Sequence, residues 1–280
     1  MISIIIPLYN KEKAIESSLR SVVSQSYKDF EIIVVDDGST DESVRIVEQF
    51  LHNYESLCRY TIITQENGGP SKARNTGIKA AGGEWIVTLD ADDELAENAL
   101  QMMMQEVEAH PDADIIDFGG YVRCKDQLHR RFHPIKGWVK KPYCSLYFRQ
   151  ISPSCGHAII RSKISKSNLY DENIRRFEDY ELELRLIRNA KIYSSQYVTE
   201  IHNVDFAEAS SARKNICEDF LGHLRFSKGD FWYKMCLYRF FIEERSNYPM
   251  ACRDMYPALF YRYDLLLLHK ILLKIEKLFR

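Results

Sequence analysis

Apolar stretches and stretches with helical spacing alternate along the first 118 residues of the chain. Residues 2–6 are almost continuously apolar, which is typical of a strand buried on both faces of a parallel sheet. Further strands are predicted at residues 31–35, 60–64 and 84–89, with a short strand near 115–116.

Apolar residues spaced three or four positions apart predict a helix after each of the first four strands. These helices span about 11–23, 44–51, 71–81 and 100–107. Asn10 is the expected cap of the first helix, a residue among 39–41 caps the second, and Gly82 ends the third. The repeated units imply right-handed crossovers and a mainly parallel sheet flanked by helices.

The second half of the chain is less regular. Residues 119–150 look like strands and loops, residues 177–189 have helical spacing, and the chain from Phe220 onward is helical in pattern and rich in aromatic residues. We therefore expect an α/β domain followed by a helical C-terminal extension.

Composition argues against a nucleic-acid-binding, a disulfide-rich, a secreted or a membrane-spanning protein. The 280 residues are 45% hydrophobic and 28% charged, with a net charge of −2, which gives no reason to expect nucleic acid as a partner. The seven cysteines are scattered without a Cys-x-x-Cys pair, as in reduced cytoplasmic proteins. Met1 leads directly into the first strand, and no apolar run approaches the roughly 20 residues of a membrane span, so we expect neither a signal peptide nor a spanning helix.

Three carboxylates follow the fourth strand within four residues: Asp90, Asp92 and Asp93. Like charges this close repel one another unless a cation or several hydrogen-bond donors share them. Hard oxygen ligands favour Mg²⁺ or Mn²⁺, which commonly bridge to substrate phosphates. The alternative is an acidic turn that favours the start of the next helix.

Polar motifs end each of the first four strands, at residues 7–10, 36–41, 67–75 and 89–93. Each could be an ordinary turn, but ligands of open α/β sheets bind at the carboxyl ends of the strands. Four motifs on one edge therefore predict a binding site. Neither a Gly-x-Gly-x-x-Gly motif after the first strand nor a Walker A motif is present, so a dinucleotide cofactor and a P-loop are not expected.

The chemistry of this edge suits a nucleotide with a pyrophosphate. The ring of Tyr9 can stack on a base, Asp37 can accept an imide N–H, and Asp90 can bind ribose hydroxyls. Arg74 can reach phosphate or base oxygens.

Together, the four motifs closely resemble those of family 2 glycosyltransferases, which have the GT-A fold. The resemblance is strong over residues 1–118 and extends to about 211. It implies an inverting transferase that uses a nucleotide-activated sugar, usually a UDP-sugar, and a divalent metal, Mn²⁺ or Mg²⁺. We therefore expect a catalytic domain at residues 1–215 and a helical C-terminal extension at residues 216–280. Within the catalytic domain, residues 1–118 would bind the nucleotide-sugar, and residues 119–215 would form the acceptor side.

The resemblance assigns roles to individual residues. Asp37 and Tyr9 would contact the uracil, Asp90 would approach the ribose, and Asp92 would bind the metal. The implied donor-binding residues are Pro7, Tyr9, Asp37, Asn67, Arg74, Asp90 and Ala91.

The family also has a Glu-Asp pair at the start of a later helix, which Glu178 and Asp179 match. The resemblance makes Asp179 the catalytic base that removes the acceptor hydroxyl proton opposite the leaving group. The alternative is that these acids only favour a helix N-terminus.

His202 matches a late metal-ligating histidine of some GT-A enzymes, with residues 210–211 resembling the serine that follows it. A lone histidine is more often structural or exposed. Residues 154–157 occupy the region that shapes the sugar and acceptor pocket in relatives, but they depart from the common aromatic-Gly-Lys pattern.

Residues 261–280 predict an amphipathic helix with two distinct faces. One face carries Lys270, Lys274, Lys277 and Arg280, and the other carries Leu268, Ile271, Leu272, Ile275, Leu278 and Phe279. Such a helix can lie on a membrane surface, or it can pack on the catalytic domain or on a second subunit in a homo-oligomer.

The sequence thus predicts an inverting, metal-dependent transferase that moves a hexose or N-acetylhexosamine from a UDP-sugar to a glycan or lipid-linked glycan in surface polysaccharide synthesis. It would work in the cytoplasm or on the inner face of the membrane. The alternatives are a non-catalytic nucleotide-sugar-binding subunit and a nucleotidyltransferase that makes the sugar nucleotide. The latter class normally has a Gly-rich loop after the first strand, where residues 7–10 provide none.

Overall fold

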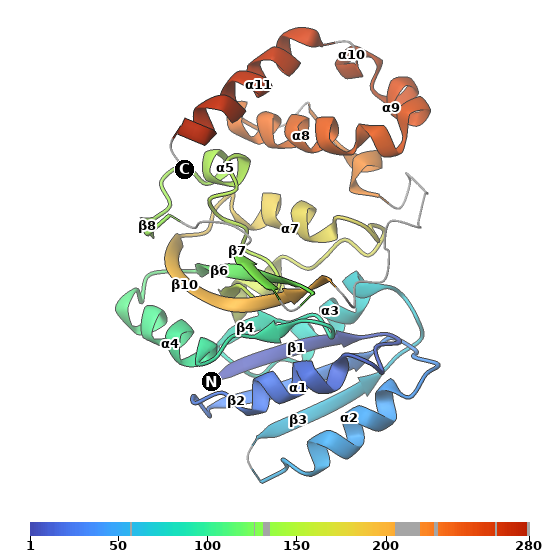
Figure 1. Cartoon of the computed structure of the whole chain (residues 1–280), viewed down its shortest axis with the longest axis vertical. Helices are drawn as coiled ribbons and strands as arrows, with labels where there is room; N and C mark the ends of the chain where they lie inside the picture. The colour runs from blue at the N-terminus through green and yellow to red at the C-terminus, as the bar shows by residue number, and fades with distance from the viewer. Residues whose placement is uncertain are drawn as a thin grey trace.

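The structure is a computed structural model that describes residues 1–56, 58–125, 127–130, 135–204, 219–226, 229–260 and 262–278. Within these residues the chain forms one ten-stranded sheet with helices on both faces (Figure 1). The strands are β1 (Ile2–Leu8), β2 (Phe30–Asp36), β3 (Arg59–Thr64), β4 (Trp85–Thr88), β5 (Glu94–Leu95), β6 (Ile115–Cys124), β7 (Gln127–Arg130), β8 (Gly137–Trp138), β9 (Ala158–Arg161) and β10 (Ile192–Asn203).

Helices follow the first four strands, as predicted, but Pro142–Tyr147 form a helix where strands and loops were expected. The described residues contain eleven α-helices. They are α1 (Ile15–Val23), α2 (Ser43–His52), α3 (Pro70–Ala80), α4 (Ala99–Ala109), α5 (Pro142–Tyr147), α6 (Ser162–Ser167), α7 (Glu178–Leu186), α8 (Phe231–Glu244), α9 (Pro249–Met255), α10 (Pro257–Phe260) and α11 (Tyr263–Leu278). The third and fourth helices lie within two residues of the predicted limits.

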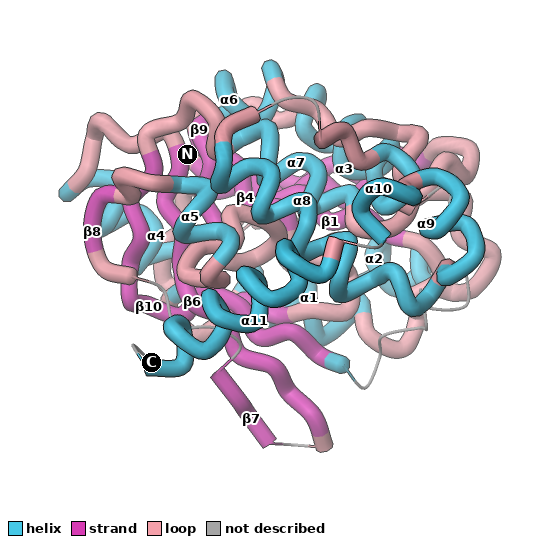
Figure 2. Tube along the Cα trace, turned by 90° about the horizontal axis from the view of Figure 1, so that it is seen from above, coloured by secondary structure: helices cyan, strands magenta, loops and turns pink. Residues whose placement is uncertain are grey.

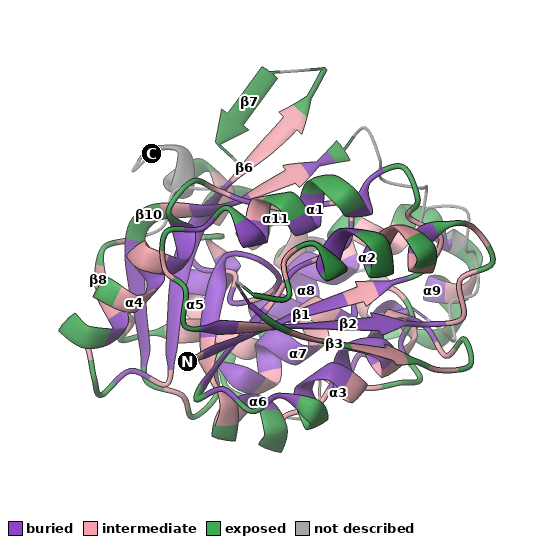
Figure 3. Ribbon diagram, turned by 90° about the horizontal axis from the view of Figure 1, so that it is seen from below, coloured by how far each residue is buried: buried purple, intermediate pink, exposed green. Residues whose placement is uncertain are grey.

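The strand order is β3-β2-β1-β4-β9-β6-β10-β5, with β7 paired to β6 and β8 paired to β10. The first four strands are parallel, as predicted. In the later half, β9 runs antiparallel to both β4 and β6, which makes the whole sheet mixed. The short strand predicted near residues 115–116 is the first part of the ten-residue β6, whose far end and β7 form an exposed hairpin that projects from the body (Figures 2 and 3).

Strand β1 lies between β2 and β4 in this order. The chain moves from β1 outward to β2 and β3, then returns to β4 on the other side of β1. The carboxyl ends of β1 and β4 therefore flank a topological switch point, which is where open α/β sheets bind ligands.

Alternate residues of β1 enter the two cores of the molecule. Ile4 and Ile6 pack in the core under α1, α2 and α4, whereas Ile5 packs in the core under α3, α5, α7 and α8. Gly77 of α3 lies directly against Ile5, and a Cβ atom at that position would collide with the Ile5 side chain. This close approach fixes α3, and with it Arg74, over the end of β1.

The first predicted helix cap is wrong. Helix α1 starts at Ile15, and the Asn10 side chain instead accepts a hydrogen bond from the Thr40 backbone N–H at 2.8 Å. Asn10 has a left-handed backbone (φ 50°), so it turns the chain before the helix can begin. Its side chain thereby joins the loops after β1 and β2.

The C-terminal helices share a core with the rest of the molecule. Phe240 and Phe241 of α8 pack in the same core as Leu182 of α7, and Leu268 of α11 packs against this core. Figure 1 shows these helices as a layer beyond α5 and α7. The predicted boundary at residue 215 lies outside the described residues.

Helix α11 packs on the catalytic domain, which was one of the alternatives that its amphipathic pattern allowed. Leu265, Leu268 and Leu272 face the core, and the Tyr147 hydroxyl lies 2.8 Å from His269 Nδ1. Ile271 is instead exposed, as is Leu267. Among the described residues, no helix is long and apolar enough to cross a bilayer.

Candidate active site

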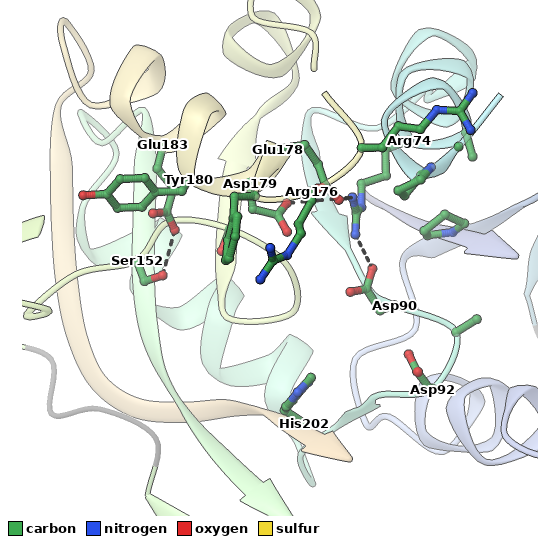
Figure 4. Close-up of a pocket in the computed structure, with 18 of the residues that line it drawn as sticks. Arg74, Asp90, Asp92, Ser152, Arg176, Glu178, Asp179, Tyr180, Glu183 and His202 are labelled. Atoms are coloured by element: carbon green, nitrogen blue, oxygen red, sulfur yellow. Dashed lines mark hydrogen bonds and ion pairs between the residues drawn. The ribbon is translucent and has the colours of Figure 1, made fainter. Parts of the chain in front are cut away.

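A cavity of about 820 Å³ opens at the carboxyl ends of β1, β2 and β4 and extends past the N-terminus of α7 to α5 and α8 (Figure 4). All ten residues predicted for the site line it. They are Pro7, Tyr9, Asp37, Asn67, Arg74, Asp90, Ala91, Asp92, Asp179 and His202. The parallel strands explain the meeting of the first eight, because their carboxyl ends share one edge of the sheet.

Asp37 holds the loop that begins α3. Its buried carboxylate accepts hydrogen bonds from the backbone N–H groups of Gly68 (2.9 Å) and Gly69 (2.7 Å) and from the Gln65 side chain (2.7 Å). Gly69 has φ 89°, which a residue with a side chain rarely adopts. Asp37 therefore shapes the rim beside Tyr9 and Asn67 in addition to lining the cavity.

Each acid of the cluster after β4 has its own partner. Asp90 Oδ1 lies 2.7 Å from Arg74, Asp92 Oδ2 lies 2.8 Å from Lys11 Nζ, and Asp93 Oδ2 lies 2.9 Å from His202 Nδ1. The Asn203 backbone N–H also donates to Asp93 (2.9 Å). The repulsion inferred from the sequence is thus relieved by protein groups, and it does not by itself require a metal.

The environments of these acids shift their pKa values in opposite directions. Burial raises the pKa of Asp93, which the hydrogen bond from His202 only partly offsets. Burial would also raise the pKa of Asp90, but the charge and hydrogen bond of Arg74 outweigh it and hold that pKa below its ordinary value. Asp90 is therefore the ionised acid at the centre of the cavity.

Arg74 links the two halves of the site. Its guanidinium is 4% exposed and donates to Asp90 on one side and to Glu178 Oε1 (2.8 Å) on the other. Its Nη1 also lies 3.9 Å from Asp179 Oδ1. In the structure, Arg74 joins Asp90 to the acids at the start of α7. Its contact with a phosphate or a base of the donor stays a prediction.

Asp179 is a partly exposed acid with a raised pKa. A third of its side chain is exposed to the cavity, and the thiol of Cys155 lies 3.7 Å from its Oδ1. Loss of hydration raises the pKa of Asp179 to about 6, with the Arg74 charge acting against the rise and the Glu178 charge adding to it. A carboxylate with this pKa can accept a proton near neutral pH.

The residues present fit a divalent cation. The described residues contain no ready-made cluster of three His, Cys, Asp or Glu side chains. Mg²⁺ and Mn²⁺ at phosphate sites, however, need only one or two carboxylates, because the substrate phosphates supply further oxygen ligands. Asp92 and His202 both line the cavity, and donation of Nδ1–H to Asp93 would leave His202 Nε2 as the ligand nitrogen, as in metal-binding histidines.

Comparison with known proteins assigns the chain to a family. The sequence model described as "Glycosyl transferase family 2" matches residues 3–172, which is more than half of the chain. The chain belongs to glycosyl transferase family 2.

Among curated proteins, the chain is 40% identical over 127 residues to the uncharacterized glycosyltransferase EpsJ of Bacillus subtilis, a match that covers 45% of this chain and 36% of EpsJ. It is 35% identical over 105 residues to the GalNAc(5)-diNAcBac-PP-undecaprenol beta-1,3-glucosyltransferase of Campylobacter jejuni, covering 38% of this chain and 34% of that enzyme. The chain thus spans little more than a third of these relatives.

Solved structures of similar shape show the fold. TarS 1-349 of S. aureus in complex with UDP-GlcNAc superposes with a TM-score of 0.73 at 21% identity, covering 91% of this chain and 75% of that one. The mannosyltransferase PcManGT of Pyrobaculum calidifontis, solved with GDP-Man and Mn²⁺, gives a TM-score of 0.62 at 19% identity, covering 92% and 73%. The fold is that of GT-A enzymes.

The family 2 motifs left part of the cavity unassigned. Sequence reasoning did not single out Lys11 opposite Asp92, nor Ser152, Glu183 and Arg239 on the far side of Asp179. Glu183 carried one local signal, since it lies one helical turn after Asp179 and so shares its face of α7. Lys11 carried none, because its partner lies 81 residues away. Residues 210–211, which resemble the serine after the metal-ligating histidine of some GT-A enzymes, lie outside the described residues.

Proposed function

We propose that this protein is an inverting glycosyltransferase that moves a hexose or N-acetylhexosamine from a UDP-sugar to a glycan or lipid-linked glycan acceptor in surface polysaccharide synthesis. The observation that carries the proposal is the position of Asp179. Its carboxylate, with a pKa of about 6, lies in the same cavity as the nucleotide-facing residues. A base across the cavity from the nucleotide is what in-line displacement with inversion needs.

In this proposal, Tyr9 and Asp37 hold the uracil and Asp90 holds the ribose. Asp179 takes the proton of the acceptor hydroxyl as its oxygen attacks the anomeric carbon, and the bond from that carbon to the UDP oxygen breaks. The UDP-GlcNAc complex of TarS supports a UDP-sugar as the donor. The acceptor class is supported by the lipid-linked substrate in the name of the Campylobacter jejuni relative.

A divalent ion, Mn²⁺ or Mg²⁺, would be held by Asp92 and His202 together with the donor diphosphate. Such an ion would neutralise the negative charge of the departing UDP. Lys11 already pairs with Asp92 and provides a second positive charge beside the same position. The Mn²⁺ in the PcManGT complex supports this part of the proposal.

We also propose that the enzyme works in the cytoplasm, on the inner face of the membrane. The support is the outward face of α11, where Leu267 (61% exposed) and Ile271 (47% exposed) alternate with the exposed Lys270 and Lys274. Apolar side chains flanked by lysines suit the surface of an anionic bilayer.

A panel of UDP-sugars with Mn²⁺, read by thermal shift and then by UDP release, tests the function. A donor that raises the melting temperature is bound by the native state. Release of UDP on addition of an acceptor supports a transferase. Binding without release would instead indicate a nucleotide-sugar-binding subunit, and pyrophosphate release from UTP and a sugar 1-phosphate would indicate a nucleotidyltransferase.

A further inference from the structure

Helix α7 presents a third carboxylate to the cavity, that of Glu183, one turn beyond Asp179. Residues four apart lie on the same helix face, with Cβ atoms about 5–6 Å apart. Glu183 is 3% exposed, lines the cavity, and accepts a hydrogen bond from Ser152 Oγ at 2.7 Å. Figure 4 shows Ser152, Tyr180 and Glu183 on one side of Asp179, with Asp90 and Asp92 on the other.

A second buried acid, Asp117, shares Ser152 with Glu183. The backbone N–H of Ser152 donates to Asp117 Oδ1 at 3.0 Å, so Asp117 and Glu183 both bind the same serine. Burial raises the pKa of Asp117 well above its usual range, and the charge of Glu183 raises it further. Buried acids with perturbed pKa values cluster at functional sites.

The surroundings favour an uncharged ligand with hydroxyl groups. Arg149 and Arg239 both pair with Glu243 at the α8 side of the cavity, at 3.0 and 2.9 Å. Glu243 thereby offsets part of the positive charge of these arginines, and the Glu183 carboxylate would repel an anion. Tyr180 adds an aromatic wall. Carboxylates that accept hydroxyl protons beside aromatic rings are suited to a sugar.

We propose that Ser152 and Glu183 bind the acceptor sugar and select a neutral one. Glu183 accepts a hydrogen bond from one hydroxyl of the acceptor ring while another hydroxyl of the same ring lies at Asp179. This inference rests on the proposed function and extends it from the donor to the acceptor.

The test uses the full chain and the UDP-sugar that binds it best. UDP release is measured against rising concentrations of methyl glycosides of glucose, galactose, N-acetylglucosamine and N-acetylgalactosamine, with methyl glucuronoside as the anionic comparison. At least one neutral glycoside should accelerate release by the wild type. Glu183→Gln should raise the KM for that glycoside roughly 10- to 100-fold, as expected for loss of a hydrogen bond to a charged group. UDP affinity, measured separately by calorimetry, should stay at the wild-type value, because Glu183 lies on the far side of Asp179 from Asp90 and Asp92.

Glu181→Gln is the matched control. Glu181 lies on the same helix but pairs with Arg185 at 2.6 Å and does not line the cavity, so its KM should not change. An unchanged KM in a folded Glu183→Gln protein would overturn the inference, as would acceleration by the glucuronoside alone or by no glycoside. If Glu183→Gln does not fold, Ser152→Ala is measured against the same prediction. A wild type that neither binds nor cleaves any UDP-sugar would defeat the proposed function itself.

Discussion

The guanidinium of Arg74 lies 3.9 Å from the carboxylate of Asp179. The same guanidinium donates a hydrogen bond to Asp90 at 2.7 Å. One buried cation therefore acts on both the donor-side acid and the proposed base. It keeps Asp90 ionised while burial holds the pKa of Asp179 at about 6. The two carboxylates share a neighbour, but their pKa values are shifted in opposite directions, which is a common arrangement in acid–base catalysis.

The pH dependence of transfer should follow Asp179. Below pH 6 its carboxyl holds the proton and cannot accept another, so kcat/KM should rise with pH through about 6 and then level off. Initial rates between pH 5 and 8 with a saturating donor would show this. A rate that falls across this range would contradict the assignment.

The same pKa shift affects stability with a definite sign. The folded protein holds the Asp179 proton to a higher pH than the unfolded chain, where the pKa is 3.8, so this group stabilises the fold less as pH rises from about 4 to 6. Asp179→Asn should therefore melt at or above the wild-type temperature at pH 8. Its transfer rate should fall by roughly 10²–10⁴, the usual contribution of a general base.

Donor affinity is the control for Asp179→Asn. UDP binding by calorimetry should remain at the wild-type value, because the residue faces the acceptor. A stable variant that binds the UDP-sugar and still transfers at more than about a tenth of the wild-type rate would rule out the base role. Glu178, which pairs with Arg74, would then be the next residue to replace.

Asp92→Asn should remove the metal dependence of UDP binding. Asn keeps the size of the side chain but loses the charge that the metal, or Lys11 in its absence, would neutralise. Calorimetric titrations of UDP with and without Mn²⁺ would measure the difference. His202→Ala should weaken the metal effect less, and a variant of Asp92 that still needs Mn²⁺ for full UDP affinity would show that the ion binds elsewhere.

The outward face of α11 should bind anionic vesicles. Because Leu268 packs on the core whereas Leu267 and Ile271 are exposed, the double variant Leu267→Ser with Ile271→Ser should fold and bind UDP but sediment less with vesicles containing anionic lipid. Leu268→Ser is the contrasting variant, since loss of its packing should lower the melting temperature. Full sedimentation of the double variant would argue that this face does not contact lipid.

The sequence by itself determined the first half of the fold and one wall of the site. Apolar runs predicted β1–β4, and apolar residues three or four positions apart predicted the helices between them. The polar motifs after those strands had to meet, because the carboxyl ends of parallel strands share one edge of the sheet. This is why Tyr9, Asp37, Asp90 and Asp92 line one cavity as expected. These features depend on local spacing, which a sequence displays directly.

Only the tertiary structure decided how the charges pair. Asp92 pairs with Lys11, which is 81 residues away in the sequence, and Asp93 pairs with His202, which is 109 residues away. Protein side chains therefore also neutralise the acid cluster that suggested a metal. The acceptor side of the cavity, with Glu183 beside Ser152, and the packing of α11 on α5 arise in the same way. Such contacts depend on which distant elements pack together, and hydrophobic periodicity shows the buried face of each element without identifying the element that covers it.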